Sequence, residues 1–274
     1  MESALGHRVA MRRLLAEHGV GQPAFAAART LHEGRIALET VGVPAVLRPA
    51  NGPRGRGVFV LESEADLERH LHAALAESPT QEAILERPGD GTGFAAIVRV
   101  DREHVAPVAL LEAIPPPGTG WFSPSTSFGE ALQAVEEAAA RSVRVLELRD
   151  GLACVELLAG SDRVQVLEVF PGPPRAELAA VVRAAAERPA AVRFLTGPPG
   201  PLPVGRVRRI GTLDKVLAFP GVVGADIDLS VGETIDRMRP DGEPRGHVLA
   251  TAETNLEAVE RAEAAARLVD VEVW

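Results

Sequence analysis

Residues 43–61 read VPAVLRPANGPRGRGVFVL. Two apolar runs flank a glycine-rich connection, and this pattern predicts a β-hairpin with an unusually long loop. Glycine has no Cβ, so the backbone N–H groups of such a loop can turn toward an anion without obstruction. Arg48 lies on the first predicted strand, and Arg54 and Arg56 lie in the loop. The stretch therefore predicts a basic, glycine-rich lid over a phosphate group.

A surface hairpin tip would use the same residues differently. Its glycines would serve the turn alone, and its arginines would be solvated. The lid interpretation and the hairpin-tip interpretation both fit the sequence. On the lid interpretation, the candidate anion-binding residues are Arg48, Gly52, Arg54, Gly55, Arg56 and Gly57.

The sequence around the hairpin predicts a small α+β unit. A helix-capping pattern begins at Ser63 and is followed by leucines at every fourth position. Residues 82–86 form a further short apolar run, so residues 36–92 are expected to fold as strand, loop, strand, helix and strand. Glu86 ends the last strand, where a carboxylate and nearby backbone groups can meet an adenine edge, although most strand-end glutamates are solvated.

Two glutamates, Glu156 and Glu168, stand within the apolar runs 152–158 and 164–170. A three-residue turn would place them directly opposite each other on one face of a hairpin, where two like charges need a cation between them. Two carboxylates that bridge Mg²⁺ and phosphate oxygens are a usual form of magnesium site. A two-residue turn would instead place Leu167 opposite Glu156, and both glutamates could equally face water on an edge hairpin.

Glycine and proline divide the chain into four expected parts. The prolines of residues 196–203 cannot continue a helix or a strand, so this stretch is the best candidate for a boundary. The residues before it contain further strands, a loop over 115–124 and two helices. The expected parts are an entry helix and remnant (1–35), a lid subdomain (36–92), a core subdomain with the glutamate hairpin (93–200) and a C-terminal α+β cap (203–274).

Composition excludes several classes of protein. A net charge of −9 disfavours general nucleic-acid binding, and a single cysteine excludes an intramolecular disulfide. No apolar run is long enough to span a membrane, and no secretory signal opens the chain, so we expect a cytoplasmic protein without a membrane or nucleic-acid partner. Lys215 is the only lysine, so any phosphate near the glycine-rich loop must be met by arginine.

Taken in order, these pieces resemble the ATP-grasp superfamily, and within it the carboxylate–amine ligases of the L-amino-acid (dipeptide) ligase branch. No single motif carries the resemblance, but the ordered set is specific and extends over almost the whole chain. The matching stretches are the entry helix (11–20), the phosphate lid (42–58), the adenine hinge (83–86), two metal-ligand motifs (153–156 and 166–171) and the C-terminal domain (246–254 and the following helix).

The resemblance implies an α+β fold, with two ATP-grasp subdomains and a small C-terminal α+β domain. It also implies an ATP-dependent ligase that joins a small-molecule carboxylate to an amine, of amino-acid type, through an acylphosphate. In that family, Glu86 would accept a hydrogen bond from the adenine amino group, and Arg48 and the lid amides would hold phosphates. Glu156 and Glu168 would bind Mg²⁺. No catalytic residue is assigned.

The sequence also departs from the family pattern. Arg48 and Arg8 stand where the family has lysines, and arginine offers a planar fork in place of a point donor. Phe170 replaces the asparagine that is the third metal ligand, and Gly172 replaces an arginine that binds substrate. These departures favour the alternative of a catalytically degenerate protein that serves as a non-enzymatic binding or partner subunit.

In the family an N-terminal domain precedes the entry helix, and we expect this chain to lack it. The apolar face of the helix over residues 9–17 is therefore expected to be exposed and to be covered by a homodimer partner or by a separate N-terminal domain.

Overall fold

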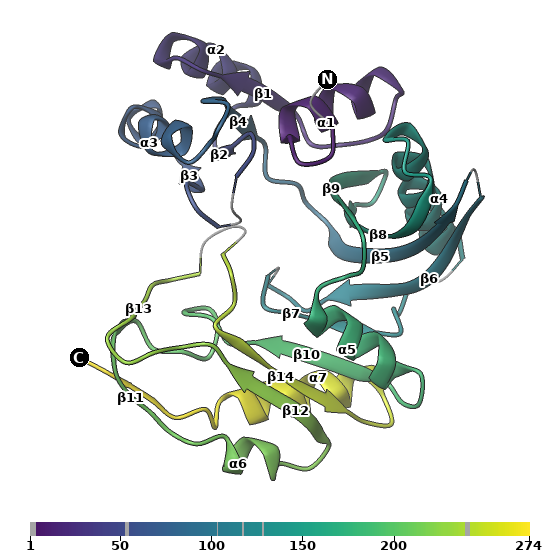
Figure 1. Cartoon of the computed structure of the whole chain (residues 1–274), viewed down its shortest axis with the longest axis vertical. Coiled ribbons are helices and arrows are strands. Elements are labelled where there is room, and N and C mark those ends of the chain that lie inside the picture. The colour runs from purple at the N-terminus through teal and green to yellow at the C-terminus, as the bar shows by residue number, and fades with distance from the viewer. Residues whose placement is uncertain (1–3, 53–54, 103, 117, 128, 239–241) are drawn as a thin grey trace. The chain divides into compact units, whose positions relative to one another are not determined.

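The computed structural model describes residues 4–52, 55–102, 104–116, 118–127, 129–238 and 242–274 (Figure 1). The chain divides into two units, each built from separate stretches of sequence. The first unit comprises Met1–Val108, Phe128–Gly172 and Arg239–Gly242, and the second comprises Ala109–Ser127, Pro173–Met238 and Glu243–Trp274. In the described residues, no helix has both the length and the apolar character needed to cross a membrane.

The first unit contains the predicted hairpin inside a four-stranded sheet of order β1-β4-β2-β3. The hairpin is confirmed, because Ala45 of β2 pairs with Leu61 of β3 in antiparallel register. β1 and α2 also belong to this layer, and the sequence analysis did not predict them. The elements are β1 (Phe25–Ala28), α2 (Leu31–Val41), β2 (Ala45–Pro49), β3 (Phe59–Leu61), α3 (Glu64–Ala76) and β4 (Ala83–Glu86).

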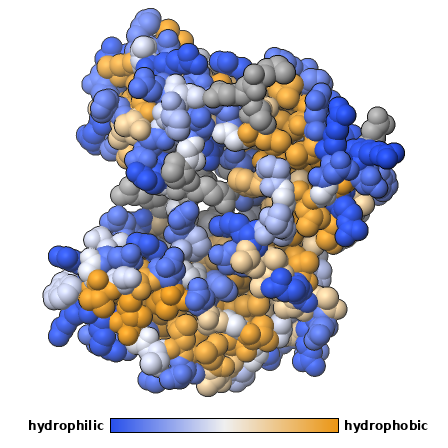
Figure 2. All heavy atoms as spheres, in the orientation of Figure 1, coloured by the Kyte–Doolittle hydropathy of each residue, from blue (hydrophilic) through white to orange (hydrophobic). Residues whose placement is uncertain are grey.

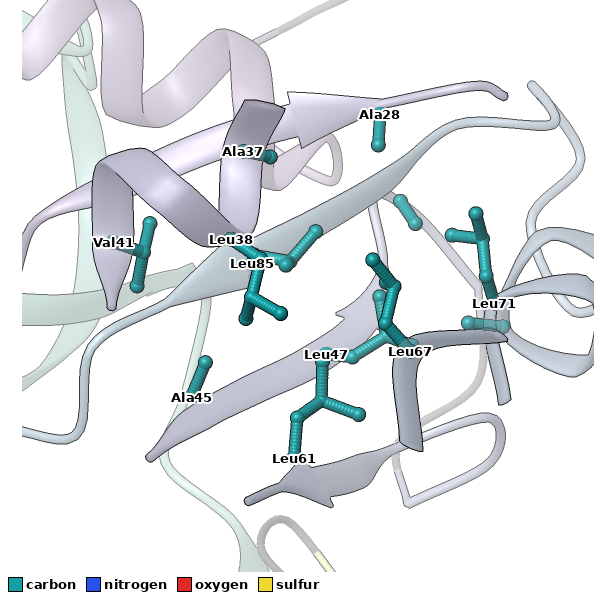
Figure 3. Packing of buried hydrophobic residues seen from close by; sticks show 12 residues of the cluster. Ala28, Ala37, Leu38, Val41, Ala45, Leu47, Leu61, Leu67, Leu71 and Leu85 are labelled. Atoms are coloured by element: carbon teal, nitrogen blue, oxygen red, sulfur yellow. The ribbon is translucent and has the colours of Figure 1, made fainter. Parts of the chain in front are cut away.

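The two helices of this layer are capped and packed as their sequences require. Ser63 accepts a hydrogen bond from the Asp66 N–H at the start of α3, and Thr30 does the same for α2. Small and branched apolar side chains from both helices then fill the space over the sheet (Figure 3). The sheet side of this core includes Ala28, Ala45, Leu47, Leu61, Ala83 and Leu85.

The rest of the first unit carries the glutamate hairpin. Strands β6, β5, β8 and β9 are neighbours in that order, β6 contributing residues 104–108 to this unit. Helix α4 lies against β5, β8 and β9. The elements are α1 (Arg8–Glu17), β5 (Thr92–Asp101), β6 (His104–Ala113), α4 (Gly129–Val145), β8 (Asp150–Ala159) and β9 (Val164–Pro171).

The prediction of an exposed apolar face on the first helix is wrong. Val9, Met11 and Leu15 of α1 are each no more than 3% exposed. Val9 packs with Ala50 and Ile84 of its own unit, so the chain itself covers this face. The apolar side of α1 therefore gives no reason to expect a dimer or a separate covering domain.

The second unit holds the remaining strands in the order β12-β14-β10-β7-β6, with β13-β11-β15 as a separate sheet. Figure 2 shows apolar side chains on the visible face of this unit. Its core contains valine and alanine side chains from β11, β14 and α7, together with Leu195 and Leu202 from the segment between β10 and β11. The elements are β7 (Gly120–Ser123), α5 (Ala176–Ala185), β10 (Ala190–Phe194), β11 (Gly205–Ile210), α6 (Asp214–Leu217), β12 (Val222–Ile227), β13 (Thr234–Ile235), β14 (Gly246–Thr251), α7 (Asn255–Ala266) and β15 (Val271–Val273).

Two proline-rich stretches of the second unit differ from what their prolines predict. Residues 120–123, within the predicted loop 115–124, form β7, and Phe122 pairs with Ala191 of β10. Residues 196–203 lie inside the unit, since β10 before them pairs with β14 after them. A proline-rich stretch interrupts an element but does not prevent the strands on either side from pairing.

Candidate functional site

Glu156 and Glu168 lie directly opposite each other on β8 and β9. The hairpin has neither of the two predicted registers along its whole length. Near the turn, Leu157 faces Val166, which is the register of a two-residue turn and would place Leu167 opposite Glu156. A bulge then inserts Leu167 as an extra residue, and from Glu156 onward the register is that of the three-residue prediction. The carboxylate pair therefore exists because of the bulge.

The surroundings of this pair are a small side chain on one neighbouring strand and a guanidinium. Both glutamates are half-buried. The other cross-strand neighbour of Glu156 is Ala95 on β5, whose methyl group fills little space. Arg8 of α1 forms an ion pair with Glu168, with Nε 3.1 Å from Oε2. A cation thus lies beside one of the two facing carboxylates, as their mutual repulsion requires.

Glu86 at the end of β4 is the centre of a second, deeper ion cluster. Arg12 Nε donates to its Oε1 over 2.6 Å, and Arg48 Nε lies 3.1 Å from its Oε2. Glu86 is 3% exposed and Arg12 is 2% exposed, so both charges are almost fully removed from water. A buried carboxylate is tolerated only when it is paired and hydrogen-bonded, and two guanidiniums meet that requirement here.

The pKa values of Glu86 and Glu168 move in opposite directions. Burial raises the pKa of Glu86, but the positive charges of Arg48 and Arg12 outweigh burial and hold it below its ordinary value. Burial also raises the pKa of Glu168, and there Arg8, Arg48 and Arg12 offset it only in part, so its pKa lies above the ordinary value. Glu86 is therefore the firmly ionised member of the cluster.

The glycine-rich loop shows why its glycines are there. Gly52 and Gly57 adopt positive φ angles, and a Cβ on Gly52 would lie 2.5 Å from the carbonyl oxygen of Glu77. Arg56 is exposed and pairs with the carboxylate of Glu77 at 3.0 Å. Close packing on Glu77 thus explains two glycines without an anion. Gly55 also has a positive φ, and Arg54 lies outside the described residues.

The structure brings four of the sequence-predicted site residues into one unit and one neighbourhood: Arg48 contacts Glu86, and Glu156 faces Glu168. The sequence analysis missed Arg12. One signal could have revealed it, because Arg12 lies between Met11 and Leu15 on the buried stripe of α1, four residues after Arg8. A guanidinium on a buried stripe requires a buried acceptor.

The donor chemistry fits Mg²⁺ held jointly with a nucleotide. Facing carboxylates are the hard oxygen ligands that Mg²⁺ prefers, and they usually bind it together with phosphate oxygens. Among the described residues, no cluster of three or more acidic, histidine or cysteine side chains could hold the metal alone. Arg8 pairs with Glu168, whereas Arg12 and Arg48 pair with Glu86 and act on Glu168 through their charge. These three guanidiniums supply charge complementary to phosphate.

Comparison with known proteins bears on the fold of the chain and on its C-terminal segment. Residues 200–273 match the family described as L-amino acid ligase C-terminal domain 2. The crystal structure of the L-amino acid ligase from Bacillus licheniformis superposes with a TM-score of 0.73 at 17% identity, covering 98% of this chain and 72% of that one.

Two curated relatives match most of the chain in sequence. The formate-dependent phosphoribosylglycinamide formyltransferase of Cronobacter sakazakii is 28% identical, over 97% of this chain and 71% of the relative. The carbamoyl phosphate synthase large chain of Thermotoga neapolitana is 23% identical, over 93% of this chain and 25% of the relative. The chain spans 25 to 36% of three of the curated relatives that it matches. The chain therefore has the ATP-grasp fold over nearly its whole length, and its residues 200–273 are similar to the C-terminal domain of L-amino acid ligases.

Proposed function

We propose that the chain acts as an ATP-dependent carboxylate–amine ligase with an amino-acid type of substrate. The observation that carries the proposal is the placement of Glu156 opposite Glu168, with the guanidiniums of Arg8 and Arg48 nearby, in a chain with the ATP-grasp fold. The similarity of residues 200–273 to L-amino acid ligases supports the choice of substrate class. Other ATP-grasp enzymes use other carboxylates, so the substrate assignment depends on that segment.

Each site residue has a definite task in this proposal. Glu156 and Glu168 hold Mg²⁺, and Arg8 and Arg48 orient the phosphates by charge-assisted hydrogen bonds. ATP, when bound, supplies the phosphoryl group that activates the substrate carboxylate for attack by the amine. Glu86 accepts a hydrogen bond from Arg12 and forms an ion pair with Arg48, but a carboxylate has about four acceptor positions, so it retains capacity for the adenine amino group.

Binding and turnover test the proposal separately. Isothermal titration of the purified chain with ADP, in the presence and absence of Mg²⁺, should show binding that depends on the metal. Release of ADP from ATP, measured with mixtures of L-amino acids, should then depend on the amino acids. Absence of metal-dependent ADP binding would refute the enzymatic proposal at its first step.

A second candidate function has its own observation. Arg8 already forms an ion pair with Glu168, and Phe170 stands at the position of the third metal ligand in the family. In this alternative, the guanidinium replaces the metal, and the chain binds a nucleotide or a partner without turnover. ADP binding that is unaffected by Mg²⁺, with no ADP release in any amino-acid mixture, would favour this candidate over the ligase.

A further inference from the structure

Arg12 makes contacts that the proposed chemistry does not use. Its Nη1 donates to the carbonyl oxygen of Val166 over 2.5 Å, and its Nη2 donates to the carbonyl oxygen of Leu167 over 2.8 Å. In a regular strand, consecutive carbonyl groups point to opposite sides, so one guanidinium cannot reach both. Both are within reach here because the strand is kinked at this point.

The kink is the bulge that sets the register of the glutamates. On the turn side of the bulge, Leu157 faces Val166, and on the far side, Glu156 faces Glu168. Leu167 is the extra residue between them. Without the bulge, the register of the turn would continue, Glu156 would face Leu167, and the side chain of Glu168 would point to the other face of the sheet.

Arg12 is itself held in place by contacts outside the bulge, with Glu86 and Gln22. Its Nε donates to Glu86 Oε1 on β4 over 2.6 Å, and its own carbonyl oxygen accepts from Gln22. The guanidinium therefore connects the strand end at Glu86 to the bulge at Leu167, and it is buried throughout. A fork of fixed geometry that is anchored at one side can determine the backbone conformation at the other.

We propose that Arg12 is a positioning residue: it holds the bulge at Leu167 and so keeps the Glu156 and Glu168 carboxylates opposite each other. The importance of this position for metal binding rests on the proposed function, but the register itself does not. The role of Arg12 can therefore be tested without a nucleotide.

A cysteine-pair reporter measures the register directly. In a Cys154→Ala background, Glu156→Cys with Glu168→Cys reports the native register, and Glu156→Cys with Leu167→Cys reports the slipped one. A short bifunctional thiol reagent, which bridges cysteines on facing positions, is applied to both pairs. Each pair is then combined with Arg12→Met and with the matched control Arg13→Met, since Arg13 is the exposed neighbour on α1.

We expect Arg12→Met to lower the yield of the 156–168 cross-link several-fold and to raise that of the 156–167 cross-link, whereas Arg13→Met changes neither. Unchanged yields with Arg12→Met in a folded chain, checked by circular dichroism, would overturn the proposal. If Arg12→Met does not fold, Arg12→Lys keeps the charge near Glu86 but cannot reach both carbonyl oxygens. Arg12→Lys should then shift the yields in the same direction, and a native yield would refute the role.

The cross-linking yields and the ADP titration together separate this inference from the proposed function. Failure of the wild-type chain to bind ADP with Mg²⁺ would refute the ligase, while a shifted cross-link would still support the role of Arg12. Metal-dependent binding by the wild-type chain, with an unshifted cross-link in the Arg12 variants, would support the ligase and refute the role of Arg12.

Discussion

Two ion pairs, one from each unit, differ in burial more than in geometry. In the first unit, the side chains of Arg12 and Glu86 are 3% and 5% exposed. In the second unit, those of Arg209 and Asp270 are 50% and 51% exposed at a similar distance. Breaking a buried pair leaves a charge without water or partner, whereas an exposed charge is simply rehydrated. The comparison teaches that ion pairs of similar length can contribute very differently to the free energy of unfolding, depending on their burial.

The largest expected effect is the loss of the carboxylate at the centre of the buried cluster. Glu86→Gln removes the carboxylate that pairs with Arg12 and Arg48 in a buried site. We expect the free energy of unfolding to fall by about 3–5 kcal/mol, as measured by urea denaturation. Glu272→Gln, an exposed partner of Arg209, is the matched control. An equal loss in both variants would show that burial does not determine how much these two ion pairs contribute to stability.

The second effect concerns ligand binding in the first unit. Glu168→Gln removes one facing carboxylate and should weaken binding of ADP with Mg²⁺ by about tenfold or more. Titration calorimetry measures it, with Glu130→Gln on the exposed start of α4 as control. Glu168→Gln could instead strengthen ADP binding in the absence of metal, because Arg8 would lose its ion pair and be available to the phosphates. That result would support the second candidate function, in which the guanidinium replaces the metal.

The third effect is a pH dependence confined to the buried cluster. The folded chain holds the pKa of Glu86 below its ordinary 4.5, so its contribution to stability is complete above pH 4.5 and is lost as the pH falls through the lower, folded value. Urea denaturation at successive pH values should therefore show a steeper acid loss for the wild type than for Glu86→Gln. Identical slopes would mean that Glu86 titrates normally.

Glu168 contributes to this pH profile with the opposite sign. Its pKa is raised in the folded chain, so protonation favours the folded state, and its contribution increases as the pH falls. Glu168→Gln should accordingly make the acid loss of stability steeper than in the wild type. A shallower slope in that variant would contradict the direction of the shift.

Local patterns predicted much of the fold. The glycine-rich hairpin, the capped helix that begins after Ser63 and the glutamate hairpin were all indicated by periodicity and turn residues, because these signals act within a few residues. β1 was missed, since four residues of which three are alanine have no periodicity to detect. β7 was missed because prolines and glycines flank it within residues 115–124 and resemble a loop, and because its pairing with β10 is long-range.

The candidate site could be predicted only in part for the same reason. Glu156 and Glu168 were identified as a pair, but the sequence offered two registers and gave no sign of the bulge that reconciles them. That bulge is stabilised by Arg12, more than 150 positions away from Leu167. A contact between such distant positions leaves no local pattern, although a guanidinium on a buried helix stripe is a signal that a buried acceptor exists.

The smallest expected effect is in the second unit and completes the comparison. Arg209 lies between Asp270 and Glu272, at 2.7 Å from a carboxylate oxygen of each, and these partners raise its pKa. Arg209→Met removes both contacts, but the two carboxylates stay hydrated and their repulsion is screened by salt. We therefore expect no change in melting temperature beyond experimental error at physiological ionic strength.

The same variant in low salt should show a small decrease, because screening is then weaker. A decrease at physiological salt comparable to that of Glu86→Gln would mean that this exposed triad stabilises the fold as strongly as the buried cluster, and that the contrast between the units is not one of burial.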